Sequence, residues 1–227
     1  MKIISNSNIF AISNIWTKEY LIQVLTSGKN PIVTDPFLIN AFMQINREDF
    51  LPEKFKQIAY ADYEIDIGYG QTLTKPTIVA QMLSYLKPKY GGKYLDIGTG
   101  TGYVAALLGF VAGDKGHVYS LERVQWLWEN ARGNIQKYKS LVNTVSVLYR
   151  DGKEGFSNYA PYDGIHISFA MEDISETLKM QLKPKGGILV VPTIDHNLRV
   201  IERISQTEWI EEIVEGFVFS LGEEGLA

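Results

Sequence analysis

From residue 93 onward, short apolar runs alternate with helical patterns, and this alternation constrains the possible folds more than any other feature of the chain. The apolar runs are rich in β-branched residues and predict strands at 93–97, 117–122, 145–149, 164–168 and 187–192. The helical patterns between them lie near 103–112, 125–137 and 174–182. Because strands that alternate with helices form βαβ units, we predict an α/β, Rossmann-like, doubly wound and mainly parallel sheet.

The two ends of the chain depart from this alternation. Residues 199–204 and 214–219 are strand-like with no helix between them, so we expect antiparallel C-terminal strands. Before the core, Thr17, the pair Asp35-Pro36 and Pro76 are typical helix starts, and residues 66–75 are expected to form an ordered loop. We therefore predict one domain, in which 1–76 are a helical N-terminal extension ending in a loop and 77–227 are the α/β core.

Composition excludes several kinds of site. The chain has no cysteine, which removes disulfides, thiolate metal sites and a cysteine nucleophile. Its three histidines lie at no metal-ligand spacing, so we expect no metal. Hydrophobic residues make up 45% of the chain and the net charge is −4, values typical of a globular domain without a basic surface for nucleic acid.

No run approaches the roughly 18 consecutive apolar residues of a membrane span, so we expect no membrane association. Residues 1–14 are interrupted by serine and asparagine and do not resemble a signal peptide. We expect a cytoplasmic protein that is a monomer.

The turn after the first core strand reads Asp96-Ile97-Gly98-Thr99-Gly100-Thr101-Gly102. A dinucleotide fingerprint needs its third glycine three positions after the second, and Tyr103 stands there. The loop, including Thr99, instead suits a cofactor without a pyrophosphate, which can lie against the glycine backbone while Asp96 faces an ammonium group. The alternative is a structural βα turn with no ligand.

Two further strand ends carry acidic residues. Glu122, followed by Arg123, ends the second strand at the spacing expected for a carboxylate that accepts ribose hydroxyls. Asp151-Gly152 ends the third strand, where a carboxylate can accept a hydrogen bond from an adenine amino group. Each could alone be a solvated strand end or a plain turn. Together with the glycine loop they favour S-adenosylmethionine as the cofactor and S-adenosylhomocysteine as its product.

Four other segments resemble motifs of the protein-L-isoaspartate O-methyltransferase family. The distinctive one is 67–76 (IGYGQTLTKP), which looks like that family's loop before the core. The others are 46–52 (NREDFLP), 160–166 (APYDGIH) and 181–187 (QLKPKGG) followed by Val191-Pro192. The resemblance covers roughly residues 17–195.

The resemblance implies methylation of the α-carboxylate of L-isoaspartyl residues in damaged proteins, a repair reaction. In that family a serine hydroxyl of the loop contacts the reacting carboxylate, and the matching residue is Thr74. Gln71 and Thr72 carry over as loop residues near cofactor and substrate. Thr74 could instead only help to start a helix at Pro76, and His166 reads as a satisfied core histidine rather than a base.

The chain departs from the family pattern on the substrate side. Phe169 and Met171 follow the fourth strand where the family has small residues, and they could narrow the pocket or fill core. The tail at 217–222 (FVFSLG) replaces a Val-Pro-Leu-like stretch that helps to bind the peptide backbone. Two alternatives therefore stay open: a related carboxyl methyltransferase with another peptide acceptor, and a homologue that binds the cofactor without turnover.

Overall fold

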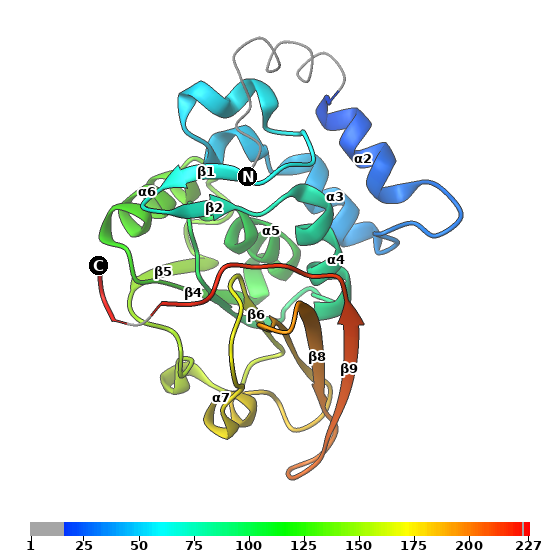
Figure 1. Cartoon of the computed structure of the whole chain (residues 1–227), viewed down its shortest axis with the longest axis vertical. Coiled ribbons are helices and arrows are strands. Elements are labelled where there is room, and N and C mark those ends of the chain that lie inside the picture. The colour runs from blue at the N-terminus through cyan, green and yellow to red at the C-terminus, as the bar shows by residue number, and fades with distance from the viewer. Residues whose placement is uncertain (1–15, 224) are drawn as a thin grey trace.

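A seven-stranded sheet forms the centre of the computed structural model, which describes residues 16–223 and 225–227 (Figure 1). Its strands are β3 (Lys93–Ile97), β4 (His117–Glu122), β5 (Val145–Tyr149), β6 (Gly164–Ile167), β7 (Gly187–Pro192), β8 (Asn197–Arg203) and β9 (Trp209–Glu215). They lie in the order β5-β4-β3-β6-β7-β8-β9; the pairs from β5 to β7 are parallel, and β8 pairs antiparallel with both β7 and β9. The predicted Rossmann-like sheet is confirmed. Its order reverses at β3, where such sheets bind ligands at the carboxyl ends of the strands.

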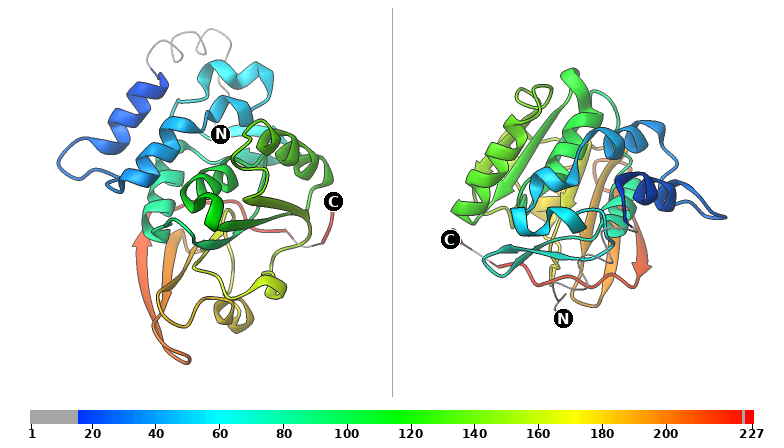
Figure 2. Two further views of the ribbon diagram at one scale, coloured as in Figure 1. Left: turned by 180° about the vertical axis from the view of Figure 1, so that it is seen from behind. Right: turned by 90° about the horizontal axis from the view of Figure 1, so that it is seen from above.

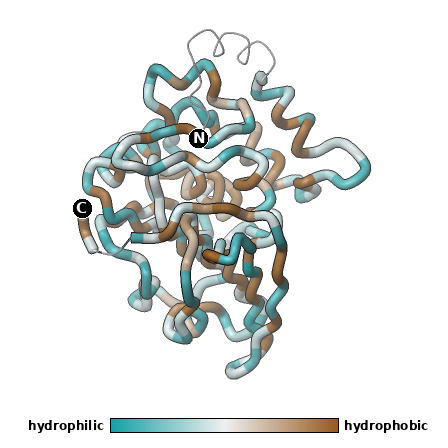
Figure 3. Tube along the Cα trace, in the orientation of Figure 1, coloured by the Kyte–Doolittle hydropathy of each residue, from teal (hydrophilic) through white to brown (hydrophobic). Residues whose placement is uncertain are grey.

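Helices cover the two faces of this sheet unequally. On one face lie α4 (Pro76–Leu86), α5 (Tyr103–Ala112) and α6 (Gln125–Gln136), and the short helix η3 (Gly113–Lys115) follows α5. Within the described residues, the helices on the other face are α7 (Glu176–Met180) and η4 (Ser157–Tyr159), so the helix expected at 174–182 is shorter than predicted. Side chains of β3 alternate between these two faces. Tyr94 packs in the apolar core under α4, α5 and α6, whereas Leu95 and Ile97 pack in the core on the side of α7. Hydrophobic stretches accordingly gather in the middle of the molecule (Figure 3).

The N-terminal extension adds a second helical layer beside α4 and α5 (Figure 2). It comprises α2 (Lys18–Thr26), α3 (Pro36–Gln44) and two short helices, η1 (Arg47–Phe50) and η2 (Glu53–Ile58). The expected caps form, because Thr17 Oγ1 accepts the N–H of Tyr20 and Asp35 Oδ1 accepts that of Leu38. The expected loop at 66–75 contains an antiparallel hairpin of β1 (Ile65–Gly68) and β2 (Gln71–Leu73).

The second tail strand was predicted at the wrong place. The expected strands at 199–204 and 214–219 are in fact β8 and β9, and β9 ends at Glu215. Ile210 and Ile213 of this edge strand are exposed beside glutamates, so β9 lacks the clean alternation that marks a half-buried strand. After Gly216 the chain leaves the sheet. No helix of the described part is long and apolar enough to cross a membrane, and the signal-peptide prediction for residues 1–14 lies outside that part.

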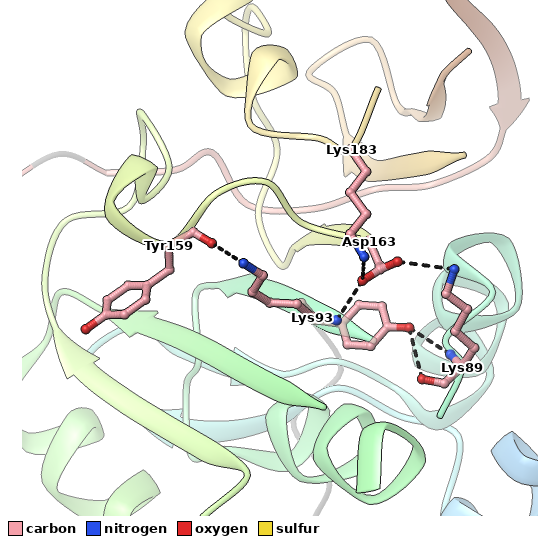
Figure 4. Close-up of polar contacts among 6 residues, drawn as sticks. Lys89, Lys93, Tyr159, Asp163 and Lys183 are labelled. Carbon is pink, nitrogen blue, oxygen red and sulfur yellow. Dashed lines mark hydrogen bonds and ion pairs between the residues drawn. The ribbon is translucent and has the colours of Figure 1, made fainter. Parts of the chain in front are cut away.

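Asp163 holds the amino-terminal edge of the parallel strands, opposite the edge where ligands bind (Figure 4). Its buried carboxylate accepts the N–H of Lys93 at 2.9 Å and contacts the ammonium groups of Lys183 at 2.6 Å and Lys89 at 3.1 Å. Burial alone would raise the pKa of Asp163, but the hydrogen bonds from Lys183 and Lys93 outweigh it and lower the pKa. This cluster ties the starts of β3 and β6 together.

Candidate functional site

A pocket of about 440 Å³ opens at the carboxyl ends of β3 and β4, next to the β1-β2 hairpin. Most of the predicted site residues line it: Gln71, Thr72, Thr74, Gly98, Gly100, Glu122, Arg123, Asp151 and Gly152. Asp96, Thr99 and Gly102 do not. The pocket therefore joins the loop that carries Thr74 to two of the three acidic strand ends, Glu122 and Asp151, which the parallel sheet brings to one edge.

The glycine loop presents backbone to the pocket. Gly98 and Gly100 have φ values of +85° and +56°, a left-handed region that residues with side chains rarely adopt. A Cβ at Gly98 would lie 3.2 Å from the ring of Phe169, and one at Gly100 would lie 3.2 Å from Ile67. Gly102 instead lies close to α6, where an added Cβ would be 3.4 Å from Ala131. The first two glycines keep the pocket wall free of side chains, and the third serves helix packing.

Asp96 lies behind the loop rather than in the pocket. It is fully buried, with Oδ1 at 2.8 Å from His166 Nδ1 and Oδ2 accepting the Ser120 hydroxyl at 2.6 Å. Ser120 Oγ is in turn 2.6 Å from Thr99 Oγ1. We expected the Asp96 carboxylate to face an ammonium group, but here it joins a network that ties β3, β4 and β6 together beneath the loop. His166 was expected to be a core histidine with its hydrogen bonds satisfied. Only its Nδ1 has a hydrogen-bond partner, since Nε2 has none in the described chain.

Glu122 provides a buried carboxylate at the rim of the pocket. Its side chain accepts the N–H of Gly100 at 2.7 Å and that of Val124 at 2.9 Å, which links the end of β4 to the glycine loop. Burial raises the pKa of the Glu122 carboxyl, and the hydrogen bonds from Val124 and Gly100 offset part of that rise. Each carboxylate oxygen has two lone pairs, so acceptor positions are left for hydroxyl groups of a ligand.

The C-terminal segment, residues 216–223 and 225–227, runs across this edge of the sheet toward β5 (Figure 1, red). Its residues 218–223 line the pocket. Beyond them the N–H of Gly225 donates to Asp151 Oδ2 at 2.7 Å, and Arg123 donates to the Gly225 carbonyl and pairs with Glu223 at 2.7 Å. No local pattern in the sequence indicates these contacts, because the partners are 74 to 102 positions apart. Arg123 therefore holds the segment that covers the Asp151 side of the pocket.

The two bulky residues after β6 have different roles. Met171 is buried and packs among the apolar side chains beneath the sheet. Phe169 lines the pocket, and its ring lies so near Gly222 that a Cβ there would come within 2.3 Å of it. Of these two bulky residues, Phe169 alone lines the pocket, where it lies against the C-terminal segment.

The hairpin forms the remaining wall of the pocket. At its tip, Tyr69 is 63% exposed, and its ring centroid lies 5.6 Å from that of Trp126 on α6. The tip of the hairpin therefore contacts the helix that follows Glu122. Thr74 follows β2 directly, and its hydroxyl makes no hydrogen bond to another described residue. That hydroxyl is available to a ligand in the pocket.

These features fit S-adenosylmethionine. Backbone at Gly98 and Gly100 leaves room for a chain laid against the loop, and Glu122 offers a carboxylate for two vicinal hydroxyls. At Gly152 an added Cβ would lie 2.5 Å from Ile97, so a larger residue does not fit there, and the apolar side chains of Ile97 and Leu121 line the pocket beside Asp151, as a flat ring requires. A pocket of this volume lies within the usual range for cofactor sites.

Comparison with known proteins gives a consistent result. The family model described as "Protein-L-isoaspartate(D-aspartate) O-methyltransferase (PCMT)" matches residues 17–219. A protein-L-isoaspartate O-methyltransferase of Methanosarcina mazei is 39% identical over 185 residues, which are 81% of this chain and 74% of that relative. One from Ignicoccus hospitalis is 40% identical over 169 residues, which are 74% and 78% of the two chains.

Solved structures agree with the sequence relatives. A structure of a protein-L-isoaspartate O-methyltransferase has a TM-score of 0.76 at 26% identity and covers 92% of this chain and 67% of its own. A Plasmodium falciparum chain in complex with S-adenosyl-L-homocysteine has a TM-score of 0.75 and covers 91% and 97% of the two chains. At 22% identity, this second likeness bears on the fold alone.

Proposed function

The chain belongs to the protein-L-isoaspartate O-methyltransferase family, and we propose that it methylates the α-carboxylate of L-isoaspartyl residues in the pocket described above. The observation that carries this proposal is that one pocket joins the hairpin residues to the glycine loop and the acidic strand ends. The family's methyl donor is S-adenosylmethionine, which becomes S-adenosylhomocysteine. Its damaged-protein acceptor makes the reaction one of protein repair.

We assign the cofactor to the side of the pocket formed by the core. Gly98 and Gly100 would lie along the methionine part, Glu122 would accept the ribose hydroxyls, and Asp151 with Gly152 would meet the adenine ring. Asp151 can do so while it holds Gly225, because each of its oxygens accepts more than one hydrogen bond. Asp96 and Thr99 would act indirectly, by holding the loop from behind.

We assign the acceptor to the side formed by the hairpin. S-adenosylmethionine supplies a methyl group on a positively charged sulfur, which is already activated for transfer. A carboxylate with a pKa of about 4 is ionised at neutral pH and needs no general base. The protein's task is then to hold the acceptor in line with the methyl group. We propose that the Thr74 hydroxyl donates a hydrogen bond to this carboxylate, with Gln71 and Thr72 beside it.

The deciding assay uses labelled S-adenosylmethionine with an isoaspartyl peptide and, as its control, the same peptide with a normal aspartyl linkage. We expect a base-labile methyl ester on the isoaspartyl peptide alone. Equal labelling of both peptides would remove the isoaspartyl assignment. Because the bulky Phe169 lines the pocket, labelling of a different carboxyl peptide in place of both would favour the alternative acceptor.

We also propose how the chain is organised and where it acts. Residues 1–76 would supply the acceptor side and 77–227 the cofactor side of one domain, since the pocket draws Thr74 from the first part and Glu122 from the second. We propose a cytoplasmic monomer that uses neither nucleic acid nor membrane, in line with a net charge of −4 and no cysteine. Light scattering of the purified chain tests the monomer directly.

A further inference from the structure

Arg47 is a buried cation that the reaction as described does not use. It begins η1 and is completely inaccessible to solvent. Burial lowers the pKa of Arg47 to about 10, so the guanidinium stays charged at neutral pH. Its face lies over the ring of Tyr103, with the guanidinium carbon 5.0 Å from the ring centroid.

The guanidinium binds backbone rather than a carboxylate. Nε donates to the carbonyl of Ala59 at 2.8 Å, and Nη2 donates to the carbonyl of Thr74 at 2.9 Å. Within residues 16–223 and 225–227, Nη1 has no hydrogen-bond partner and Arg47 forms no ion pair. A buried charge without an ion pair costs free energy, and the neutral carbonyls offset only part of that cost. A buried arginine that serves packing alone would be better replaced by an apolar residue.

The second of these carbonyls belongs to Thr74, whose hydroxyl is proposed above to meet the acceptor. Just beyond Thr74, the carboxylate of Asp62 accepts the N–H and the hydroxyl of Thr77 in the first turn of α4. The short stretch between hairpin and helix is thus bound at two points. Arg47 binds the carbonyl of Thr74, and Asp62 binds the N–H of Thr77. Fixing the peptide plane of Thr74 also fixes the direction in which its side chain leaves the backbone.

We propose that Arg47 is a positioning residue for methyl transfer: its guanidinium holds the Thr74 carbonyl and so directs the Thr74 hydroxyl at the acceptor carboxylate. This inference rests on the proposed function. Lysine is the informative replacement, because it keeps the charge but lacks the planar fork that reaches two carbonyls at once.

Arg203 is a matched control within the same chain. It is also buried, it also donates to main-chain carbonyls, among them those of Met180 and Leu182, and it also lies over an aromatic ring, that of Trp209. It belongs to β8 and does not line the pocket. If kcat falls only because a buried arginine has been replaced, the fall should therefore be the same in R47K and R203K.

The experiment measures both variants with an isoaspartyl peptide and, separately, their affinity for S-adenosylhomocysteine by calorimetry. We expect kcat of R47K to fall roughly 10- to 100-fold, the scale of a misplacement of about 1 Å. Its affinity for S-adenosylhomocysteine should stay within about twofold of wild type, as should kcat of R203K. A kcat for R47K within about threefold of wild type, or an equal loss in R203K, would overturn the proposal.

A second measurement separates this proposal from the proposed function. If the wild-type chain makes no ester on the isoaspartyl peptide, the proposed function fails, and NMR of the Thr74 methyl group then decides the role of Arg47. Its signal, assigned with T74S, should shift and lose order in R47K but not in R203K. An unmoved signal overturns the proposal.

If R47K does not fold, the wild-type chain supplies the test through the Nε–H signals of its two buried arginines. Addition of isoaspartyl peptide with S-adenosylhomocysteine should shift the signal of Arg47 and leave that of Arg203 in place. A stationary Arg47 signal would contradict the proposal.

Discussion

Glu122→Gln tests the cofactor side of the pocket with the smallest change of shape. In the wild-type chain one carboxylate oxygen accepts the N–H of Gly100 and the other accepts that of Val124. An amide has one oxygen and one NH₂ group, so in either orientation one of these backbone N–H groups faces another donor. The substitution thus removes a buried hydrogen bond and one charged acceptor at the same time.

The two losses have separate magnitudes. The backbone N–H left without a partner should lower the free energy of unfolding by about 1–3 kcal/mol. The lost hydrogen bond from a ribose hydroxyl to a charged acceptor should weaken cofactor binding by about 1.5–3 kcal/mol. Since 1.4 kcal/mol is a factor of ten, Kd for S-adenosylhomocysteine should rise roughly 10- to 150-fold.

Calorimetry with S-adenosylhomocysteine and urea unfolding measure the two losses independently. Asp163→Asn is the matched control, because Asp163 is also a buried acid that accepts a backbone N–H, but it lies at the opposite edge of the sheet. It should lose stability with Kd unchanged within about twofold. Wild-type affinity should also fall as pH drops toward the raised pKa of Glu122, whereas the glutamine variant should lack this dependence. An unchanged Kd in Glu122→Gln would refute the ribose assignment.

Three further outcomes are expected. Thr74→Ala should lower kcat about tenfold or more with little change in cofactor affinity, and Thr74→Ser should restore it, as peptide kinetics will show. The lowered pKa of Asp163 stabilises the fold above the ordinary aspartate value of 3.8, and this contribution is lost as pH falls through the lower folded pKa; acid unfolding should therefore show a steeper loss of stability in wild type than in Asp163→Asn. Arg123→Gln removes the pair with Glu223, a partly exposed contact, so stopped-flow displacement should show about a two- to fivefold faster release of S-adenosylhomocysteine.

The sequence predicted the core of the fold because its signals are local. The glycine loop stands between a buried strand and an apolar helix, so a few adjacent residues carry both the turn and the start of α5. The closeness of Glu122 and Asp151 could be predicted from the sequence, because parallel strands align their carboxyl ends at one edge of the sheet.

Other parts of the site depend on contacts that local patterns do not carry. The position of Asp96 follows from its partners Ser120 and His166, which lie beside it on neighbouring strands and draw its carboxylate into the sheet. The course of the C-terminal segment follows from Asp151 and Arg123, which lie 74 and 102 residues before the backbone of Gly225 that they bind. The sequence pattern around Asp96 does not indicate its two partners, and the pattern of the C-terminal segment does not indicate that Asp151 and Arg123 bind it.

A structure of the chain with S-adenosylhomocysteine and an isoaspartyl peptide tests most directly the claim that one pocket holds cofactor and acceptor together. The account predicts that the Glu122 carboxylate accepts the ribose hydroxyls while the Thr74 hydroxyl donates to the isoaspartyl α-carboxylate, with the Thr74 carbonyl still bound by Arg47. A peptide carboxylate bound away from Thr74, or a ribose that does not touch Glu122, would contradict it.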